Sequence, residues 1–291
     1  MKASPFRYHR PSTIAEAVEL LATLDNARAI AGGQSLMPMM NLRLVAPDHL
    51  IDLGGIEELV GLTEKNNTIS IGAMTTQRTI ERSELMARDC PLIIAALRHV
   101  GHQQTRNRGT IGGSLCHLDP GAELPVAAAS LDAVLVAIGR SGERRIPFDE
   151  FSVGLLSNAL SPDELLARIE LPKTGPRTGT AFLEFNRRPA DFAVVSVATS
   201  LALDTTGRIA QAAIAVGGSF EAPIRLRAFE TASVGRRPEP ALFDRAAREV
   251  EAIECVGDDV YPAEYRQELA GVLVRRALDS ALAGMESHAD A

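Results

Sequence analysis

The feature that most constrains the fold is a break in the sequence pattern at residues 171–179, LPKTGPRTG. Two prolines and two glycines interrupt the run of apolar residues here. Proline lacks a backbone N–H and glycine favours turns, so such a cluster ends regular elements. We therefore expect a domain over residues 1–175 and a second domain over residues 176–291, each with enough residues to bury a core.

The first of these domains is expected to be a mixed α+β unit. Thr13 and Glu16 have the spacing of a capping box before an apolar stripe, which predicts a helix. The apolar residues 27–31 stop abruptly at a glycine pair, as a strand that leads into a tight loop would. Other expected elements are helices over residues 75–85 and 91–101, a hairpin around residues 66–67, and a buried helix followed by a strand over residues 124–138.

The second domain begins with a strong hairpin signal. Residues 194–203 and 208–216 are rich in β-forming residues and are joined by Asp204-Thr205-Thr206-Gly207, a turn sequence. From residue 240 onward the apolar spacing is helical. This order predicts a short antiparallel sheet backed by helices.

Composition excludes several classes of protein. The net charge is -7, from 30 basic and 37 acidic residues, which argues against a nucleic-acid or membrane-surface binder. The N-terminal residues carry no apolar run, and no segment approaches the roughly 20 apolar residues of a transmembrane helix. We expect a soluble, cytoplasmic protein. A local basic cluster between Arg98 and Arg108 could face a partner or a phosphate.

The three cysteines limit what this chain can bind by itself. Cys90, Cys116 and Cys255 are far apart in the sequence and form no CxxC pair. They therefore indicate neither a disulfide framework nor a structural zinc site. Three cysteines also cannot supply the four thiolates that iron–sulfur clusters usually require.

Two glycine pairs share one design and suggest a phosphate site. Ala31-Gly32-Gly33-Gln34-Ser35 and Thr110-Ile111-Gly112-Gly113-Ser114 each place a hydroxyl after paired glycines. Consecutive backbone N–H groups in glycine turns can bind anions, and a helix that begins after the loop adds its positive end. Two such loops could hold a diphosphate from both sides, although paired glycines also occur in ordinary tight turns.

The motifs of the common nucleotide and hydrolase folds are absent. The chain contains no GxGxxG, no GxxxxGK[ST] and no GxSxG. His99 with His102, or His117 with Asp119, could bind a metal, but a third ligand at defined spacing is missing, so we expect no metal site. Cys116 beside His117 is a weak nucleophile–base candidate, because adjacent side chains in an extended loop point apart.

The second glycine segment leads into two acids held by prolines. Asp119 precedes Pro120, and Glu123 stands two residues before Pro125. Fixed carboxylates suit acceptors for ribose or ribityl hydroxyls. The same acids could instead stabilise the start of the helix that follows, and both interpretations can hold together.

These segments together resemble a known family. AGGQS, RNRGTIGGSLCHLDPGAELP, and ELLARIELP followed by GTAFLEFNRRPADFAVVSVA are similar to the flavoprotein subunit of the molybdenum hydroxylases, the xanthine dehydrogenase and aerobic carbon monoxide dehydrogenase family. The likeness covers nearly the whole chain. It implies a PCMH/VAO-type FAD-binding domain of two α+β subdomains, followed by a C-terminal domain with a three-stranded antiparallel sheet and helices.

The resemblance also assigns roles within the site. The two glycine segments would hold the FAD diphosphate, Asp119 and Glu123 would meet the sugar or ribityl part, and Phe192 would pack against the isoalloxazine ring. The family often has Asp at the position of Glu123, and Leu183 replaces a lysine of xanthine dehydrogenase, which argues against NAD use of that kind. The implied cofactor-binding residues are Ala31, Gly32, Gly33, Gln34, Ser35, Thr110, Ile111, Gly112, Gly113, Ser114, Cys116, His117, Asp119, Glu123, Leu166 and Phe192.

The resemblance implies an electron-transfer subunit with no catalytic acid or base of its own. A large subunit would carry the molybdenum cofactor and a small subunit two [2Fe–2S] clusters, in a dimer of heterotrimers, and FAD on this chain would pass electrons to an external acceptor. Two alternatives stay open: a self-sufficient PCMH-type flavin oxidoreductase, and a nucleotide-binding regulatory protein. The substrate and the acceptor are not determined by this sequence.

Overall fold

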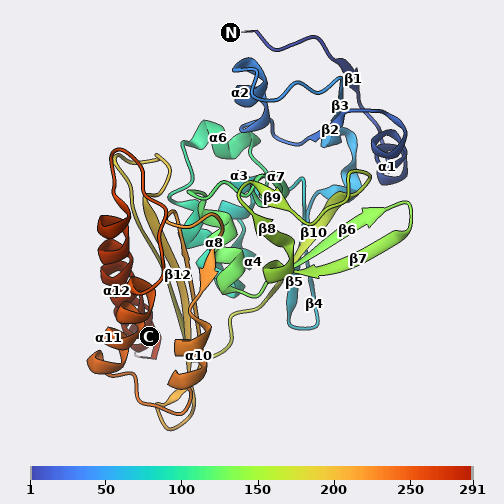
Figure 1. Cartoon of the computed structure of the whole chain (residues 1–291). Coiled ribbons are helices and arrows are strands. Elements are labelled where there is room, and N and C mark those ends of the chain that lie inside the picture. Colours follow the sequence, from blue (N-terminus) through green and yellow to red (C-terminus); the bar gives the residue numbers. More distant parts are fainter. Residues whose placement is uncertain (1, 290–291) are drawn as a thin grey trace.

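The computed structural model describes residues 2–289 and begins with a small parallel sheet (Figure 1). Its strands are ordered β1-β3-β2, and two helices connect them. Thr13 caps the first helix by accepting a hydrogen bond from the Glu16 N–H, which confirms one half of the predicted capping box. The Glu16 carboxylate accepts from the Ser12 N–H and not from the Thr13 N–H. The elements are β1 (Arg7–His9), α1 (Ile14–Thr23), β2 (Ala27–Ile30), α2 (Leu36–Asn41) and β3 (His49–Asp52).

A second, antiparallel sheet has the order β4-β5-β10-β6-β7. Its strands are β4 (Leu62–Lys65), β5 (Thr68–Gly72), β6 (Val134–Gly139), β7 (Gly142–Pro147) and β10 (Leu165–Pro172). Helices line it: α3 (Gln77–Glu81), α4 (Glu84–Asp89), α5 (Pro91–Leu97), α6 (Gln103–Arg108), α7 (Ile111–His117) and α8 (Glu123–Ser130). The short α9 (Phe148–Phe151) and the hairpin of β8 (Ser152–Gly154) and β9 (Ser157–Asn158) follow β7.

The C-terminal sheet is built from three long antiparallel strands and one very short strand. The order is β11-β12-β13-β14, so the expected three-stranded sheet has gained a two-residue edge strand. The elements are β11 (Thr178–Phe185), β12 (Val195–Leu203), β13 (Ile209–Gly217), β14 (Ile224–Arg225), α10 (Arg227–Ser233), α11 (Pro240–Glu251) and α12 (Ala263–Ala289).

Both faces of the C-terminal sheet are covered. α12 packs on β11 and β12 from one side, and α5 and α8 pack on β11 to β13 from the other (Figure 1). Ala198 on β12 and Ala215 on β13 accordingly belong to the core of the preceding helices, whereas Val197 and Val216 belong to the core beneath α11 and α12. Every residue of α8 is buried. The start of α8 is therefore held on all sides, which fixes the carboxylate of Glu123 in place.

Several local expectations need correction. Residues 75–85 form two helices, because the Ser83 hydroxyl caps α4 by accepting from the Met86 N–H. The hairpin around Asn66 and Asn67 is confirmed, and its first strand begins at Leu62. The domain boundary between residues 175 and 176 stays a prediction. No helix within residues 2–289 is long and apolar enough to cross a lipid bilayer.

Candidate functional site

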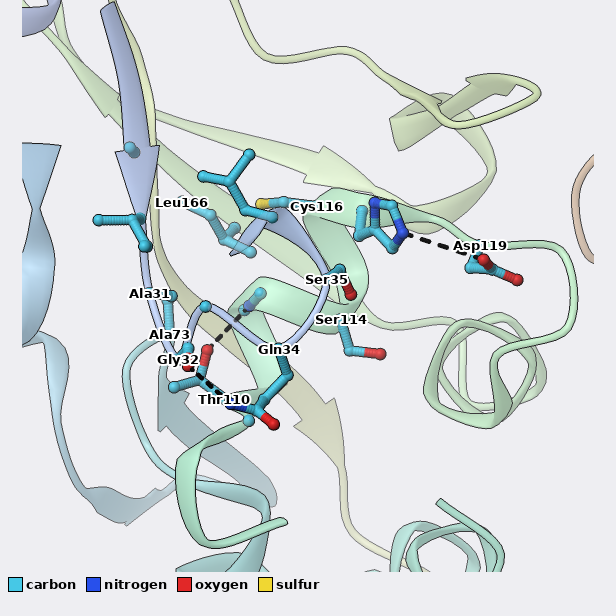
Figure 2. A pocket seen from close by; sticks show the side chains of 18 of the residues that line it. Ala31, Gly32, Gln34, Ser35, Ala73, Thr110, Ser114, Cys116, Asp119 and Leu166 are labelled. Carbon is cyan, nitrogen blue, oxygen red and sulfur yellow. Dashed lines mark hydrogen bonds and ion pairs between the residues drawn. The ribbon is translucent and has the colours of Figure 1, made fainter. Parts of the chain in front are cut away.

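A cavity of about 770 Å³ brings the candidate residues together (Figure 2). Its wall is formed by the loop after β2, the start of α7, the acidic segment before α8, β10 and the β8–β9 hairpin. Every candidate residue except Ile111 lines it. Ile111 is 1% exposed and packs in the hydrophobic core without lining this cavity, and its expected role in cofactor binding stays a prediction.

The loop of residues 31–35 presents unpaired backbone amides. Within residues 2–289, no hydrogen bond uses the N–H groups of Gly32, Gly33, Gln34 or Ser35 as a donor. Gly33 has φ +71°, a backbone conformation that glycine adopts without steric cost. The Gln34 side chain folds back so that its Nε2 donates to the Gly32 carbonyl at 3.2 Å (Figure 2). Adjacent unpaired N–H groups of this kind suit an anion.

The second glycine segment is the first turn of helix α7 and not a loop. Thr110 is the N-cap, and its hydroxyl oxygen accepts from the Gly113 N–H at 3.0 Å. The Ile111 N–H donates to Thr75 O and the Gly112 N–H to Ala73 O. Within residues 2–289, unpaired backbone N–H groups are thus found in the first segment, whereas those of residues 111–114 are used inside the protein, and the contact with a diphosphate stays a prediction.

Two of the glycines are required by packing between backbones. A Cβ on Gly32 would lie 1.9 Å from Arg108 O, and a Cβ on Gly112 would lie 2.6 Å from the Cβ of Ala73. A Cβ on Gly113 would instead lie 3.6 Å from the Cβ of Ala31. Gly113 and Ala31 are therefore neighbours in the cavity wall. The two glycine segments together form one continuous part of this wall, which we call the cradle.

Asp119, Glu123 and Phe192 all line the cavity. Asp119 Oδ1 accepts from the Gly121 N–H at 2.9 Å, and its other oxygen lies 3.9 Å from His117 Nε2. A Cβ on Gly121 would lie 3.0 Å from the Cβ of Phe192, so this ring stands directly against the acidic segment. The Phe192 side chain is 62% exposed, which excludes a core-packing role for it.

Glu123 is an acid in an apolar place. It is 5% exposed, and burial raises the pKa of its carboxyl to about 8, with the negative charges of Glu184 and Asp119 acting in the same direction. Near neutral pH the side chain is therefore mostly protonated and can donate as well as accept a hydrogen bond.

Cys116 and His117 lie in the last turn of α7 and not in a loop. Burial raises the pKa of the Cys116 thiol to about 12, and burial lowers the pKa of His117. A thiol with such a pKa stays protonated and is a poor nucleophile. The pair therefore lines the cavity without forming a nucleophile and a base.

Gln77 is a cavity residue that the sequence did not reveal. It lies at the start of α3, is 4% exposed, and its Oε1 atom is buried without a hydrogen-bond partner within residues 2–289. A buried amide oxygen without a partner is costly and marks a place where a donor from a ligand would fit. No motif surrounds this residue, so no sequence signal could have identified it.

The basic cluster between Arg98 and Arg108 is not one surface. Arg106 donates to the carbonyls of Val100 and Gly101 and pairs with Glu81. His99 contacts Glu184, and Arg108 contributes its backbone carbonyl to the packing against Gly32. Among the described residues there is no group of three or more His, Cys, Asp or Glu side chains that could hold a metal ion.

The wall of the cavity fits a dinucleotide with a diphosphate. It combines unpaired amides at residues 32–35, the unpartnered oxygen of Gln77, two carboxyl groups and apolar surface that includes Leu166 on β10. Pockets for large organic cofactors usually have this composition, mainly apolar with a few placed polar groups. Fold and cavity together define a cofactor-binding protein.

Comparison with known proteins specifies the class. The family model described as the FAD binding domain in molybdopterin dehydrogenase matches residues 4–174, and that of the CO dehydrogenase flavoprotein C-terminal domain matches residues 180–281. The chain is similar to the carbon monoxide dehydrogenase medium chain of Afipia carboxidovorans, with 36% identity over 96% of this chain and 97% of that one.

Two further proteins give the same result. Subunit alpha of the 6-hydroxypseudooxynicotine dehydrogenase complex of Paenarthrobacter nicotinovorans is 35% identical over 97% of this chain and 96% of its own length. A solved carbon monoxide dehydrogenase from Hydrogenophaga pseudoflava superposes with a TM-score of 0.94 at 35% identity, covering 97% of this chain and 99% of that one. The chain therefore belongs to the family of FAD-binding medium subunits of the molybdenum hydroxylases.

Proposed function

We propose that the chain is the electron-transfer flavoprotein subunit of a heterotrimeric molybdenum hydroxylase. A large subunit would bind the molybdenum cofactor and a small subunit two [2Fe–2S] clusters, in a dimer of heterotrimers. The observation that carries the proposal is the row of unpaired amides at residues 32–35 in a cavity of dinucleotide size. The relation to medium chains of multi-subunit dehydrogenases supports the partners.

The residues of this chain would bind and orient FAD, which supplies the redox chemistry when bound. The amides of residues 32–35 would hold the diphosphate, and the hydroxyl groups of Thr110 and Ser114 lie on the same cavity wall. Asp119 and Glu123 would accept or donate hydrogen bonds at the ribityl part. Leu166 would contact the adenine, and Phe192 would cover the isoalloxazine ring and keep water away from it.

The positions of the three cysteines support the proposal that the iron–sulfur clusters lie on another subunit. Cys90 is buried in the core of the helices that surround the second sheet, and Cys255 is buried in the core beneath α11 and α12. Cys116 lines the cavity as a protonated thiol. Three thiols in three separate places cannot share one cluster. Electrons would therefore reach this chain from a cluster on another subunit and leave to an external acceptor.

Expression together with the neighbouring reading frames tests this function. The expected result is co-purification with a molybdenum-binding subunit and a cysteine-rich subunit, with iron and molybdenum in the preparation and FAD on this chain. If the chain binds FAD but recruits neither partner, a self-sufficient flavin oxidoreductase replaces the proposal. If the purified chain takes up no FAD, both functions are wrong.

A further inference from the structure

A buried arginine of the C-terminal helix reaches the backbone beside Phe192. Arg266 lies in α12 and is 8% exposed. Its Nη1 atom donates to Val194 O at 3.2 Å and to Gly218 O at 2.7 Å. Val194 follows Phe192 by two residues, and Gly218 comes directly after β13. One side chain therefore joins two backbone segments that are distant in the sequence.

The loop before α12 holds the same guanidinium from another side. The Nε atom of Arg266 donates to Tyr261 O at 3.2 Å, and its Nη2 atom pairs with the Asp258 carboxylate. Asp258 is itself fixed, because its Oδ1 atom accepts from the N–H groups of Val260 and Tyr261 at 2.8 and 2.7 Å. The donors of a guanidinium form a rigid planar fork. All four acceptors must therefore keep their places for these bonds to form together.

The two segments that the arginine joins are bonded in turn to the acidic segment of the cavity, which begins at Asp119. The Gly218 N–H donates to Pro120 O at 2.8 Å. The Ala193 N–H donates to Gly121 O at 3.2 Å. A continuous set of hydrogen bonds thus runs from α12 through both segments to the acidic segment.

The backbone around Phe192 is packed closely, whereas its ring is not. A Cβ on Gly218, which has φ +83°, would lie 2.7 Å from Val194 O, and a Cβ on Gly121 would lie 3.0 Å from the Cβ of Phe192. The Ser219 hydroxyl also donates to Val194 O, at 3.3 Å. The Phe192 side chain is 62% exposed, so core packing cannot hold it. Its place at the cavity is set by the bonded backbone on either side of it.

We propose that Arg266 is a positioning residue of the cofactor site, which holds Phe192 and the acidic segment in the relative places that the isoalloxazine ring requires. The inference rests on the proposed function, because that function places Phe192 against the ring. Arg266 does not line the cavity and acts through the backbone that it fixes. None of its hydrogen bonds within residues 2–289 reaches residues 32–35. Its effect therefore falls on the ring of the cofactor and not on the diphosphate.

A first measurement uses the chain without cofactor. Hydrogen exchange followed by mass spectrometry reports how often the backbone opens in the peptides that contain the amides of Gly121, Ala193 and Gly218. In Arg266→Met these amides should exchange at least about tenfold faster than in wild type, because two backbone carbonyls lose a charged donor. Exchange at the wild-type rate overturns the inference, whether or not the chain binds FAD.

Two further variants serve as control and as replacement. Arg275→Met is the matched control, because this arginine of the same helix pairs with Asp244 and Asp279 and, within residues 2–289, bonds to neither segment. Asp258→Asn keeps an oxygen for the amides of its own loop and removes the charge beside Arg266. It should accelerate exchange at the same amides, but less. If Arg266→Met does not fold, Asp258→Asn decides in its place, and exchange at the wild-type rate there overturns the inference.

A second measurement uses the FAD-loaded chain and separates the ring from the rest of the cofactor. The visible circular dichroism of bound FAD reports the surroundings of the ring, and it should weaken in Arg266→Met. The affinity for FAD should fall about tenfold. The affinity for ADP, which has the diphosphate but no flavin ring, should change less than about twofold. Equal losses of FAD and ADP affinity would show a general loss of structure and overturn the inference.

The remaining outcomes separate the positioning role from the proposed function. Equal acceleration of exchange in Arg266→Met and Arg275→Met overturns the inference, because the effect would then be one of general stability. Unchanged circular dichroism in Arg266→Met with FAD bound also overturns it and leaves the flavoprotein function intact. Failure of wild type to bind FAD overturns the proposed function, and hydrogen exchange then decides by itself whether Arg266 holds the backbone beside Phe192.

Discussion

At the scale of single residues, the site depends on side chains and amides in unusual states. Glu123 carries a proton where most glutamates are charged. Among residues 2–289, the Gln77 oxygen has no donor and the amides of residues 32–35 have no acceptor. Groups in such states cost stability in the empty protein and gain partners when a ligand binds. They therefore mark the cavity as a binding site independently of any family relation.

The protonation of Glu123 should make the stability of the cofactor-free chain depend on pH. Its folded pKa of about 8 lies above the value of about 4.3 in the unfolded chain. Its contribution is therefore fully present below the unfolded pKa and is lost as pH rises through 8. In Glu123→Gln this loss disappears, so the variant should gain up to about 1.4 kcal/mol per pH unit over wild type within that window.

Urea unfolding between pH 5 and pH 9 measures this difference. Glu150→Gln, at an exposed position on α9, is the control and should follow the wild-type curve. Parallel curves for wild type and Glu123→Gln would show that the carboxyl is charged in the folded protein.

Gly32 and Gly284 give a second prediction at this scale. A Cβ at position 32 would collide with a backbone carbonyl that cannot move alone, whereas at position 284 it would meet no neighbouring atom within 4 Å. Gly32→Ala should lose about 1–3 kcal/mol of unfolding free energy and most of its FAD binding. Gly284→Ala in α12 should be neutral or stabilising. Equal FAD affinity in the two variants, by fluorescence titration, would contradict this account of the cradle.

At the scale of elements, helix α7 is where local sequence was most misleading. Two glycines in TIGGSLCH indicated a loop, because each costs roughly 1 kcal/mol in a helix. Ile111 and Leu115 lie on one face and are buried, and Thr110 caps the helix. This burial outweighs the glycine penalty. Thr110 is followed by Ile111 and Leu115, two apolar residues four positions apart, and this pattern indicated a helix. The two glycines between them obscured the pattern.

The cap and the cavity hydroxyl of α7 can be tested separately. Thr110→Ala removes the oxygen that accepts from the Gly113 N–H and should cost about 1 kcal/mol of stability as well as FAD affinity. Ser114→Ala removes a hydroxyl that faces the cavity and caps nothing. It should weaken FAD binding on the order of tenfold with little change in stability. Comparable losses of stability in both variants would show that Ser114 has a structural role.

At the scale of the whole molecule, the C-terminal sheet is tied to the helices beneath the cavity. Arg225 on β14 donates to Ala129 O and to Asp132 at the end of α8, and it pairs with the buried Glu230. The Glu230 carboxylate also accepts from the Ile214 N–H. The hydrogen bonds of Arg225 to Ala129 O and Asp132 connect the C-terminal sheet to helix α8, which carries Glu123. The geometry of the cavity is therefore coupled to the packing of the C-terminal part.

Replacing the arginine should loosen this connection. Arg225→Met removes the closer and more buried of the two arginines beside Glu230, leaves only Arg227 at 3.6 Å, and should cost about 3–5 kcal/mol of unfolding free energy. Arg227→Met removes the more distant partner of Glu230 and a partner of Asp132 from an exposed position, where the expected loss is below about 1 kcal/mol. Thermal unfolding and limited proteolysis compare the two, and equal effects would mean that Arg225 does not join the two parts.

The sequence predicted the glycine segments, the acids and the antiparallel sheet, because each depends on neighbouring residues. It could not predict that Gln77 and the β8–β9 hairpin would come close to them. These residues reach the site only through the packing of α3 and β9, which no local pattern records. Positions along the chain were thus predictable, and distances between distant segments were not.

A crystal structure of the chain with bound FAD tests the central claim most directly. The account predicts diphosphate oxygens within hydrogen-bond distance of the N–H groups of residues 32–35, and the isoalloxazine ring against Phe192 and beside Glu123. A diphosphate bound elsewhere, with these amides still unpaired, would contradict it.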